Sequence, residues 1–201
     1  MNTEQFRELI ATRREGRNLE FKQSMPWSSA EWKAKLVKSV LAFSNVRDGG
    51  NIVIGIEESN TGEFVLAGMP EEHHSGYNQD DVDSEVAIFA DPYAKCTVHK
   101  LIVDGTRFVV LDVEEFLEVP VICKKDGVNN LRKGAVYTRA YGKAETIIVP
   151  SQTEMREILE VATDKTTRKF LERAQRVGLL STLPPLPSAD ERYDEQLEDL
   201  Q

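Results

Sequence analysis

One helix and the strand that follows it constrain the fold of this chain more than any other segment. The capping pattern Ser28-x-x-Glu31 predicts the start of a helix over residues 29 to 46. Its apolar side chains would lie on one helix face: Trp32, Leu36, Val37, Val40, Leu41 and Phe43. Asp48-Gly49-Gly50 then predicts a turn into the strand Ile52-Val53-Ile54, whose unbroken hydrophobicity indicates burial on both faces. A helix that leads into a buried strand favours a sheet covered by packed helices.

The rest of the chain adds elements of both kinds. We expect helices at 3–13 and 80–89, a loop at 69–79, and a long helix from Ser151 or Thr153 to about Arg176. Asp104-Gly105 predicts a tight hairpin between strands 97–103 and 107–113, and further strands are expected at 18–22, 63–66, 119–124 and 135–139. These elements predict an α+β fold with a mixed central sheet, packed helices and a long C-terminal helix. We assign residues 1–180 to this domain and residues 181–201 to a flexible, Pro-containing acidic tail.

Length and composition limit the class of protein. At 201 residues with 40% hydrophobic content, the chain is long enough for one domain with a substantial core. It contains no apolar stretch of the roughly 18 residues that a membrane span needs, and its first residues do not follow the pattern of a signal peptide. We therefore expect a cytoplasmic protein without a membrane partner. Cys96 and Cys123 lie in strand-like segments, where we expect buried thiols.

The net charge of −9 argues against a nucleic-acid partner, but the charge is unevenly distributed. Residues 188–201 contain six acids and one base. A segment that we call the basic strip contains six bases and one acid: Lys124, Lys125, Arg132, Lys133, Arg139 and Lys143, with Asp126. We expect Arg132, Lys133, Arg139, Lys143 and, upstream, Arg14 to contact phosphates, with Tyr137 or Tyr141 stacking on a base or sugar. An exposed hairpin with solvated charges and core tyrosines is the alternative.

Three carboxylates could meet if the first two strands are neighbours. Glu15 precedes the strand at 18–22, Glu20 lies within it beside Lys22, and Glu57 follows the strand Ile52-Val53-Ile54. Acids tolerate such proximity when a divalent cation or a lysine lies among them. A Mg²⁺ or Mn²⁺ ion held in this way activates water and stabilises charge on a phosphodiester, which is nuclease chemistry. A surface ion pair between Glu20 and Lys22, without catalysis, is the alternative.

The order of these motifs resembles the AlbA-type domain of the Schlafen family. The resemblance rests on Glu15-Gly16-Arg17-Asn18-Leu19-Glu20-Phe21-Lys22, on residues 45–57 and on residues 132–144, and it covers roughly residues 14–159. It implies nucleic-acid binding and a three-acid ribonuclease site. In that site Glu15, Glu20 and Glu57 would bind Mg²⁺ or Mn²⁺, with Glu58 as the substitute for Glu57, and Lys22 would stabilise phosphate charge. The family more often has aspartate at the third position.

Two functions therefore remain open. The preferred one is a nucleic-acid-binding domain of the Schlafen type, with RNA favoured over DNA. The more specific version of this function is a metal-dependent endoribonuclease that acts on structured RNA such as tRNA. Such a protein would fit a defence or regulatory role. The alternative is a non-catalytic regulatory or protein-interaction module with a vestigial acid site. The apolar stripe of the C-terminal helix covers the sheet or pairs with a second copy, which would make the protein a homodimer.

Overall fold

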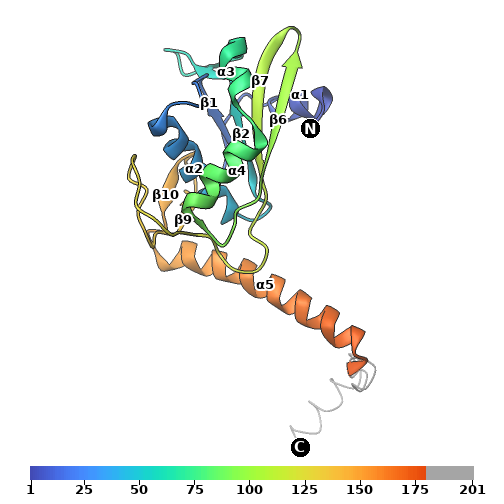
Figure 1. Ribbon diagram of the computed structural model, residues 1–201. Helices are drawn as coiled ribbons and strands as arrows, with labels where there is room; N and C mark the ends of the chain where they lie inside the picture. Colours follow the sequence, from blue (N-terminus) through green and yellow to red (C-terminus); the bar gives the residue numbers. More distant parts are fainter. Residues whose placement is uncertain (180–201) are drawn as a thin grey trace, which may run out of the picture. The chain divides into compact units, whose positions relative to one another are not determined.

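The computed structural model describes residues 1–179, and these residues confirm the predicted α+β fold (Figure 1). The chain divides into two compact units, Met1–Ala162 and Thr163–Gln201. The described part of the second unit, residues 163–179, consists mainly of the C-terminal part of helix α5 (Gln152–Arg176), which begins in the first unit. The predicted acidic tail, 181–201, lies outside the described residues. No helix among residues 1–179 is long and apolar enough to cross a membrane.

A mixed four-stranded sheet forms the centre of the first unit. Its strands lie in the order β1 (Leu19–Lys22), β2 (Gly50–Ile54), β7 (Thr106–Val113) and β6 (Cys96–Val103). β1 and β2 are parallel and are joined by helix α2 (Ala30–Ser44), whereas β2–β7 and β7–β6 are antiparallel. In the β6–β7 hairpin, Asp104 and Gly105 both have positive φ angles, of 52° and 78°, as the predicted tight turn requires. β1 therefore forms one edge of the sheet.

Separate hydrophobic clusters cover the two faces of the sheet. On one face, Ile52 and Ile54 pack with side chains of α2 and of helix α4 (Gln79–Phe89). On the other face, Val53 and Phe21 pack with Phe6 of helix α1 (Thr3–Leu9). Residues of a strand alternate between faces, so Glu20 and Lys22, on either side of Phe21, belong to the α2 face.

Smaller elements complete the first unit. The predicted loop at 69–79 is wrong in part, because it contains the short helix α3 (Glu71–Gly76), which has Pro70 before it and two acids in its first turn. The sequence analysis also missed strand β10 (Thr146–Ile148), which pairs antiparallel with β9 (Tyr137–Arg139). Two further two-stranded ladders join β3 (Glu57–Glu58) to β4 (Phe64–Val65) and β5 (Ala90–Asp91) to β8 (Ile122–Cys123).

Both ends of α2 depend on particular side chains. The N-cap is Ser29, whose side chain accepts the N–H of Trp32, so the predicted capping pattern is shifted by one residue. At the other end Asn45 is buried, and its Nδ2 lies 2.8 Å from the carbonyl oxygen of Val121 and 2.9 Å from that of Tyr137. Its Oδ1 accepts the N–H of Val121 at 2.8 Å. Asn45 thereby joins the end of α2 to β9 and to the segment before β8.

Candidate functional site

Glu20 and Lys22 lie together on β1, on the α2 face of the sheet. Glu20 is 5% exposed, and its Oε1 lies 2.6 Å from Nζ of Lys22 and 3.4 Å from Nη1 of Arg139. Its second oxygen, Oε2, is buried without a hydrogen-bond partner among the described residues. Two cations therefore compensate one buried carboxylate, which is the condition under which a charge of this kind is tolerated inside a protein.

Arg139 is fully buried, contrary to the prediction that it lies on the surface and contacts phosphates. Its guanidinium lies over the ring of Phe43, 5.0 Å from the centroid, and donates to Oγ1 of Thr146 at 3.1 Å and to the carbonyl oxygen of Gly16 at 3.4 Å. The prediction failed because Arg139 faces the core from β9, where Glu20 supplies the opposite charge. Arg139 is thus a positioning residue for Glu20.

Glu15 closes the edge of β1. Its Oε1 accepts the N–H of Phe21 at 2.6 Å, a donor at the outer edge of the sheet. Partial burial is the main reason that the pKa of Glu15 is raised, and the negative charge of Glu20 raises it further; the Phe21 N–H, Lys22 and Arg139 act in the opposite direction. The structure therefore brings Glu15, Glu20 and Lys22 into one group, as the sequence predicts.

Glu57 does not join this group as a third ligand. Gly55 and Ile56 both donate their N–H groups to the carbonyl oxygen of Lys22, and this bulge shifts the alternation so that Ile54 and Ile56 pack on opposite faces. Glu57 follows in β3, where it pairs with Val65 of β4, and its side chain is exposed, as is that of Glu58. Within residues 1–179 no three His, Cys, Asp or Glu side chains are placed so that they could hold a metal ion. The acids in this arrangement do not fit a three-carboxylate metal centre.

The cations of the basic strip fall into two places. Lys124, Lys125, Arg132 and Lys133 are exposed and form one group, because Gly134 donates to the carbonyl oxygen of Cys123 and the N–H of Lys133 donates to Asp126. Lys143 is also exposed but lies in the turn between β9 and β10, at the other end of β9. None of these five side chains forms an ion pair with an acid among residues 1–179.

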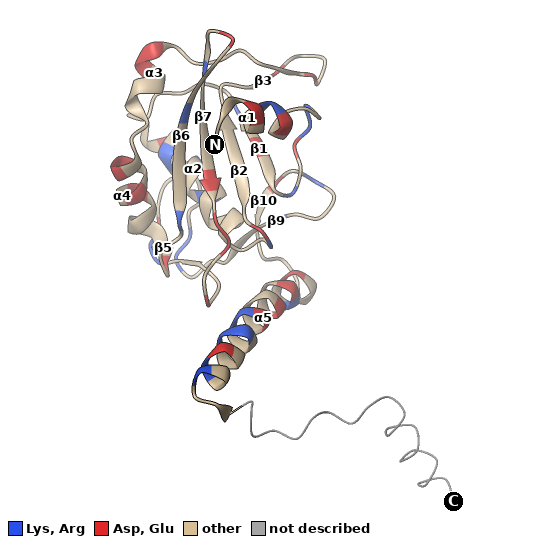
Figure 2. Cartoon of the chain, turned by 90° about the vertical axis from the view of Figure 1, so that its right-hand side faces the viewer, with Lys and Arg blue, Asp and Glu red and all other residues tan. Residues whose placement is uncertain are grey.

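Figure 2 shows acidic residues on α3 and α4, and basic residues on the loops beside β1 and β10. Arg13 and Arg14, in the loop that leads to β1, are exposed and lack an ion-pair partner among the described residues. The β1 edge of the sheet therefore carries cations although the whole chain is acidic.

A further group at this edge was not predicted from the sequence. Arg17 donates to both carboxylate oxygens of Glu157 on α5, with Nη1 2.7 Å from Oε1, and its guanidinium lies 4.0 Å from the ring centroid of Tyr141. Hydrogen bonding to Arg17 is the main reason that the pKa of Glu157 is lowered. Nothing local to Arg17 in the sequence indicates a partner so far along the chain.

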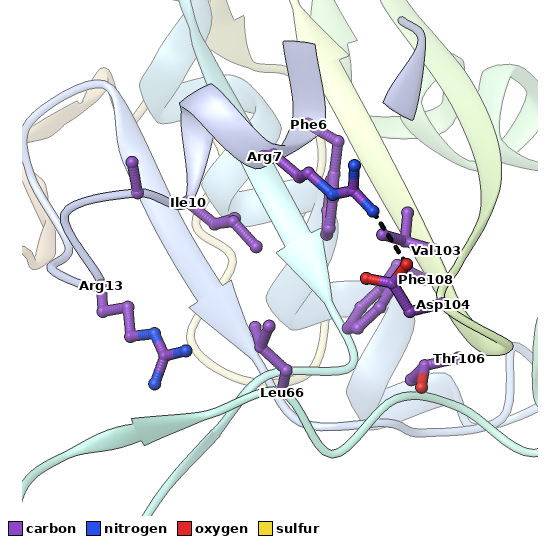
Figure 3. Close-up of a pocket in the computed structure, with 10 residues that line it drawn as sticks. Phe6, Arg7, Ile10, Arg13, Leu66, Val103, Asp104, Thr106 and Phe108 are labelled. Carbon is purple, nitrogen blue, oxygen red and sulfur yellow. Dashed lines mark hydrogen bonds and ion pairs between the residues drawn. The ribbon is translucent and has the colours of Figure 1, made fainter. Parts of the chain in front are cut away.

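A hollow of about 340 Å³ lies on the opposite, α1 side of the sheet (Figure 3). Its walls are apolar and come from α1, the β6–β7 hairpin and the segment after β4: Phe6, Ile10, Leu66, Val103 and Phe108. Arg7 and Asp104 form an ion pair of 2.8 Å at its rim, and Arg13 lies at its other side. The hollow and the Glu20 group are therefore separated by the sheet.

The comparisons with known proteins give the family. The sequence model of the family described as Schlafen, AlbA_2 matches residues 15–147. A search of curated proteins found no match. Among solved structures, the N-terminal domain of a RecG-related protein from Nitrosomonas europaea is 18% identical with a TM-score of 0.49, and the match covers 76% of this chain and 96% of that domain.

A second solved structure is that of the DIP2311 protein from Corynebacterium diphtheriae. It is 17% identical with a TM-score of 0.46, and the match covers 73% of this chain but only 26% of the DIP2311 chain. The present chain thus corresponds to about a quarter of that protein. The family match includes β1 with Glu15, Glu20 and Lys22, as well as β9 with Arg139 and the Tyr141 turn. The chain belongs to the Schlafen, AlbA_2 family.

Proposed function

We propose that this domain binds nucleic acid at the β1 edge of its sheet and on the exposed basic loops before and after β9. The observation that carries the proposal is the set of exposed cations that no described acid neutralises: Arg13, Arg14, Lys124, Lys125, Arg132, Lys133 and Lys143. When phosphates bind such side chains, condensed counterions are released from the nucleic acid, and this release favours binding. Cations that are already paired with acids do not contribute in this way. The family assignment supports the same function.

Lys22 is the cation that joins this surface to the acid group. Its Nζ lies beside the buried Glu20, yet its side chain is 26% exposed. Lys22 is therefore accessible to a phosphate that approaches the α2 face of β1, whereas Glu20 beside it is buried. In this proposal Glu15 and Glu20 have supporting roles. Glu15 fixes the backbone of β1, and Glu20 orients the side chain of Lys22. Metal-dependent cleavage of RNA stays a prediction, which a separate cleavage experiment tests.

The experiment measures fluorescence anisotropy of labelled single-stranded and duplex RNA and DNA at several salt concentrations. We expect Arg132→Gln/Lys133→Gln to weaken binding and to reduce the salt dependence by about 0.7–0.9 per lost phosphate contact. The matched control is Arg7→Gln/Lys95→Gln, which removes the same charge from cations already paired with Asp104 and Glu114. No binding at low salt, or an equal loss for both double variants, would overturn the proposal.

The same samples, incubated with Mg²⁺, Mn²⁺ or EDTA and separated on a denaturing gel, test for cleavage. Cleavage that needs the metal and disappears in Glu15→Gln/Glu20→Gln would establish the endoribonuclease. RNA that is bound but intact under all three conditions would refute the catalytic form of the function and leave the binding proposal standing.

A further inference from the structure

Tyr141 presents an aromatic face to solvent at the β1 edge. The residue is 55% exposed, although the guanidinium of Arg17 covers one face of its ring at 4.0 Å from the centroid. Tyr141 lies in the turn between β9 and β10, which is closed by the hydrogen bond from Ala140 N–H to the carbonyl oxygen of Glu145 at 2.9 Å. The exposure therefore belongs mainly to the ring face that points away from Arg17.

The contact partner of Tyr141 is itself held in place. Both Nη atoms of Arg17 donate to the carboxylate of Glu157, and the side chains of this ion pair are only 23% and 24% exposed. The same carboxylate is the first cause of the raised pKa of Tyr141. The guanidinium that covers the Tyr141 ring is thus anchored by a partly buried ion pair, so that little freedom of Arg17 remains to be lost when a ligand covers the outer face of the ring.

This pair lies directly beside the Glu20 group. Arg17 follows Glu15 by two residues, and Tyr141 follows Arg139 by two. The carbonyl oxygen of Gly16, next to Arg17, accepts a hydrogen bond of 3.4 Å from Arg139. Lys143, exposed and without an ion-pair partner among residues 1–179, is in the same turn as Tyr141. An aromatic face with a free cation beside it matches a nucleobase that is followed by its phosphate.

We propose that Tyr141, supported by Arg17, is a stacking platform for one unpaired nucleobase, so that the domain prefers single-stranded nucleic acid to duplex. The inference rests on the proposed function and names its substrate class. Bases within a duplex are stacked on each other and cannot lie on a side chain, whereas those of single strands and loops can. Every base has a π-face, so the platform does not select a sequence.

The test compares a single strand with a blunt-ended duplex that has no loop and contains the same strand, as RNA and as DNA. We expect Tyr141→Ala to weaken binding of the single strand about 5- to 100-fold and to leave duplex binding nearly unchanged. Tyr141→Phe keeps the ring and should retain single-strand affinity. The control is Tyr93→Ala, which removes a tyrosine of similar exposure, 51%, whose hydroxyl bonds to Asp83 of α4.

A second readout reports stacking itself. A single strand that carries 2-aminopurine should lose fluorescence on binding to the wild type and to Tyr141→Phe, but not to Tyr141→Ala. Equal affinity of wild type and Tyr141→Ala for the single strand would overturn this proposal. If Arg132→Gln/Lys133→Gln still weakened binding, the proposed function would survive, whereas a wild type that binds none of the probes would refute both.

Discussion

Arg139→Met tests whether the buried arginine supports Glu20. The substitution keeps an extended side chain in the core but leaves the carboxylate with Lys22 alone, at 2.6 Å. Loss of one partner of a buried ion pair costs about 3–5 kcal/mol, and because Lys22 remains we expect the lower end, about 3 kcal/mol. With a urea dependence of about 2 kcal/mol per molar, the midpoint of unfolding should fall by about 1.5 M.

The assay is urea unfolding followed by tryptophan fluorescence. Trp27 and Trp32 are both buried in the core cluster that includes α2, so their emission reports loss of the same packing. The double variant Glu20→Gln/Arg139→Met removes the charge as well as its partner. We expect it to be more stable than the sum of the single changes predicts, with a coupling energy of about 1–3 kcal/mol.

The control is Arg7→Met, which breaks the ion pair with Asp104 at the surface. An exposed pair contributes little, and we expect a change within about 0.5 kcal/mol. If Arg139→Met were as mild as Arg7→Met, or if the effects at Glu20 and Arg139 were additive, the argument that the two charges support each other would be refuted.

Three further predictions concern the framework of the site. Asn45→Ala removes three firm hydrogen bonds from the end of α2, and we expect a loss of about 3 kcal/mol in urea unfolding; a loss below about 1 kcal/mol would contradict this. Gly49→Ala should destabilise by more than about 2 kcal/mol, because φ is +68° and the new Cβ would lie 2.1 Å from the carbonyl oxygen of Val113; a soluble variant with the wild-type melting temperature would show this to be wrong. The pKa of Glu15 is raised above 4.5, so the folded state holds the proton more tightly and the contribution of Glu15 to stability falls as pH rises through that range. Glu15→Gln keeps an acceptor for Phe21 and should therefore gain stability relative to the wild type as pH rises; urea midpoints from about pH 4 to about pH 7 measure this, and a constant difference would count against it.

Sequence analysis correctly predicted the helices and turns whose formation depends on residues close together in the sequence. The apolar spacing of residues 29–46 and the Asp104-Gly105 turn correctly gave α2 and the β6–β7 hairpin. Strand β10 was missed because only pairing with β9 stabilises its three residues. The grouping of Glu15, Glu20 and Lys22 followed from strand alternation and their short separation in sequence.

The remaining features of the site depend on contacts between distant segments. Nothing near Arg139 distinguishes it from the exposed bases of the same strip; its burial follows from meeting Glu20 across the fold. The stacking of Tyr141 on Arg17 likewise requires Glu157, which lies on a helix after the matched family region. A partner that is distant in sequence leaves no local signal, so such residues can be assigned only from the structure.

The position of Glu15 has a consequence for self-association. β1 is an edge strand, and an edge with free N–H groups can pair with the edge of another chain. The carboxylate of Glu15 accepts the N–H of Phe21, so this donor is not available to another strand. The turn that joins Gly16 to Leu19 precedes Phe21 along the same edge. A residue that the sequence suggests as a catalyst therefore also protects the sheet from adding a strand, and its loss would expose a surface prone to aggregation.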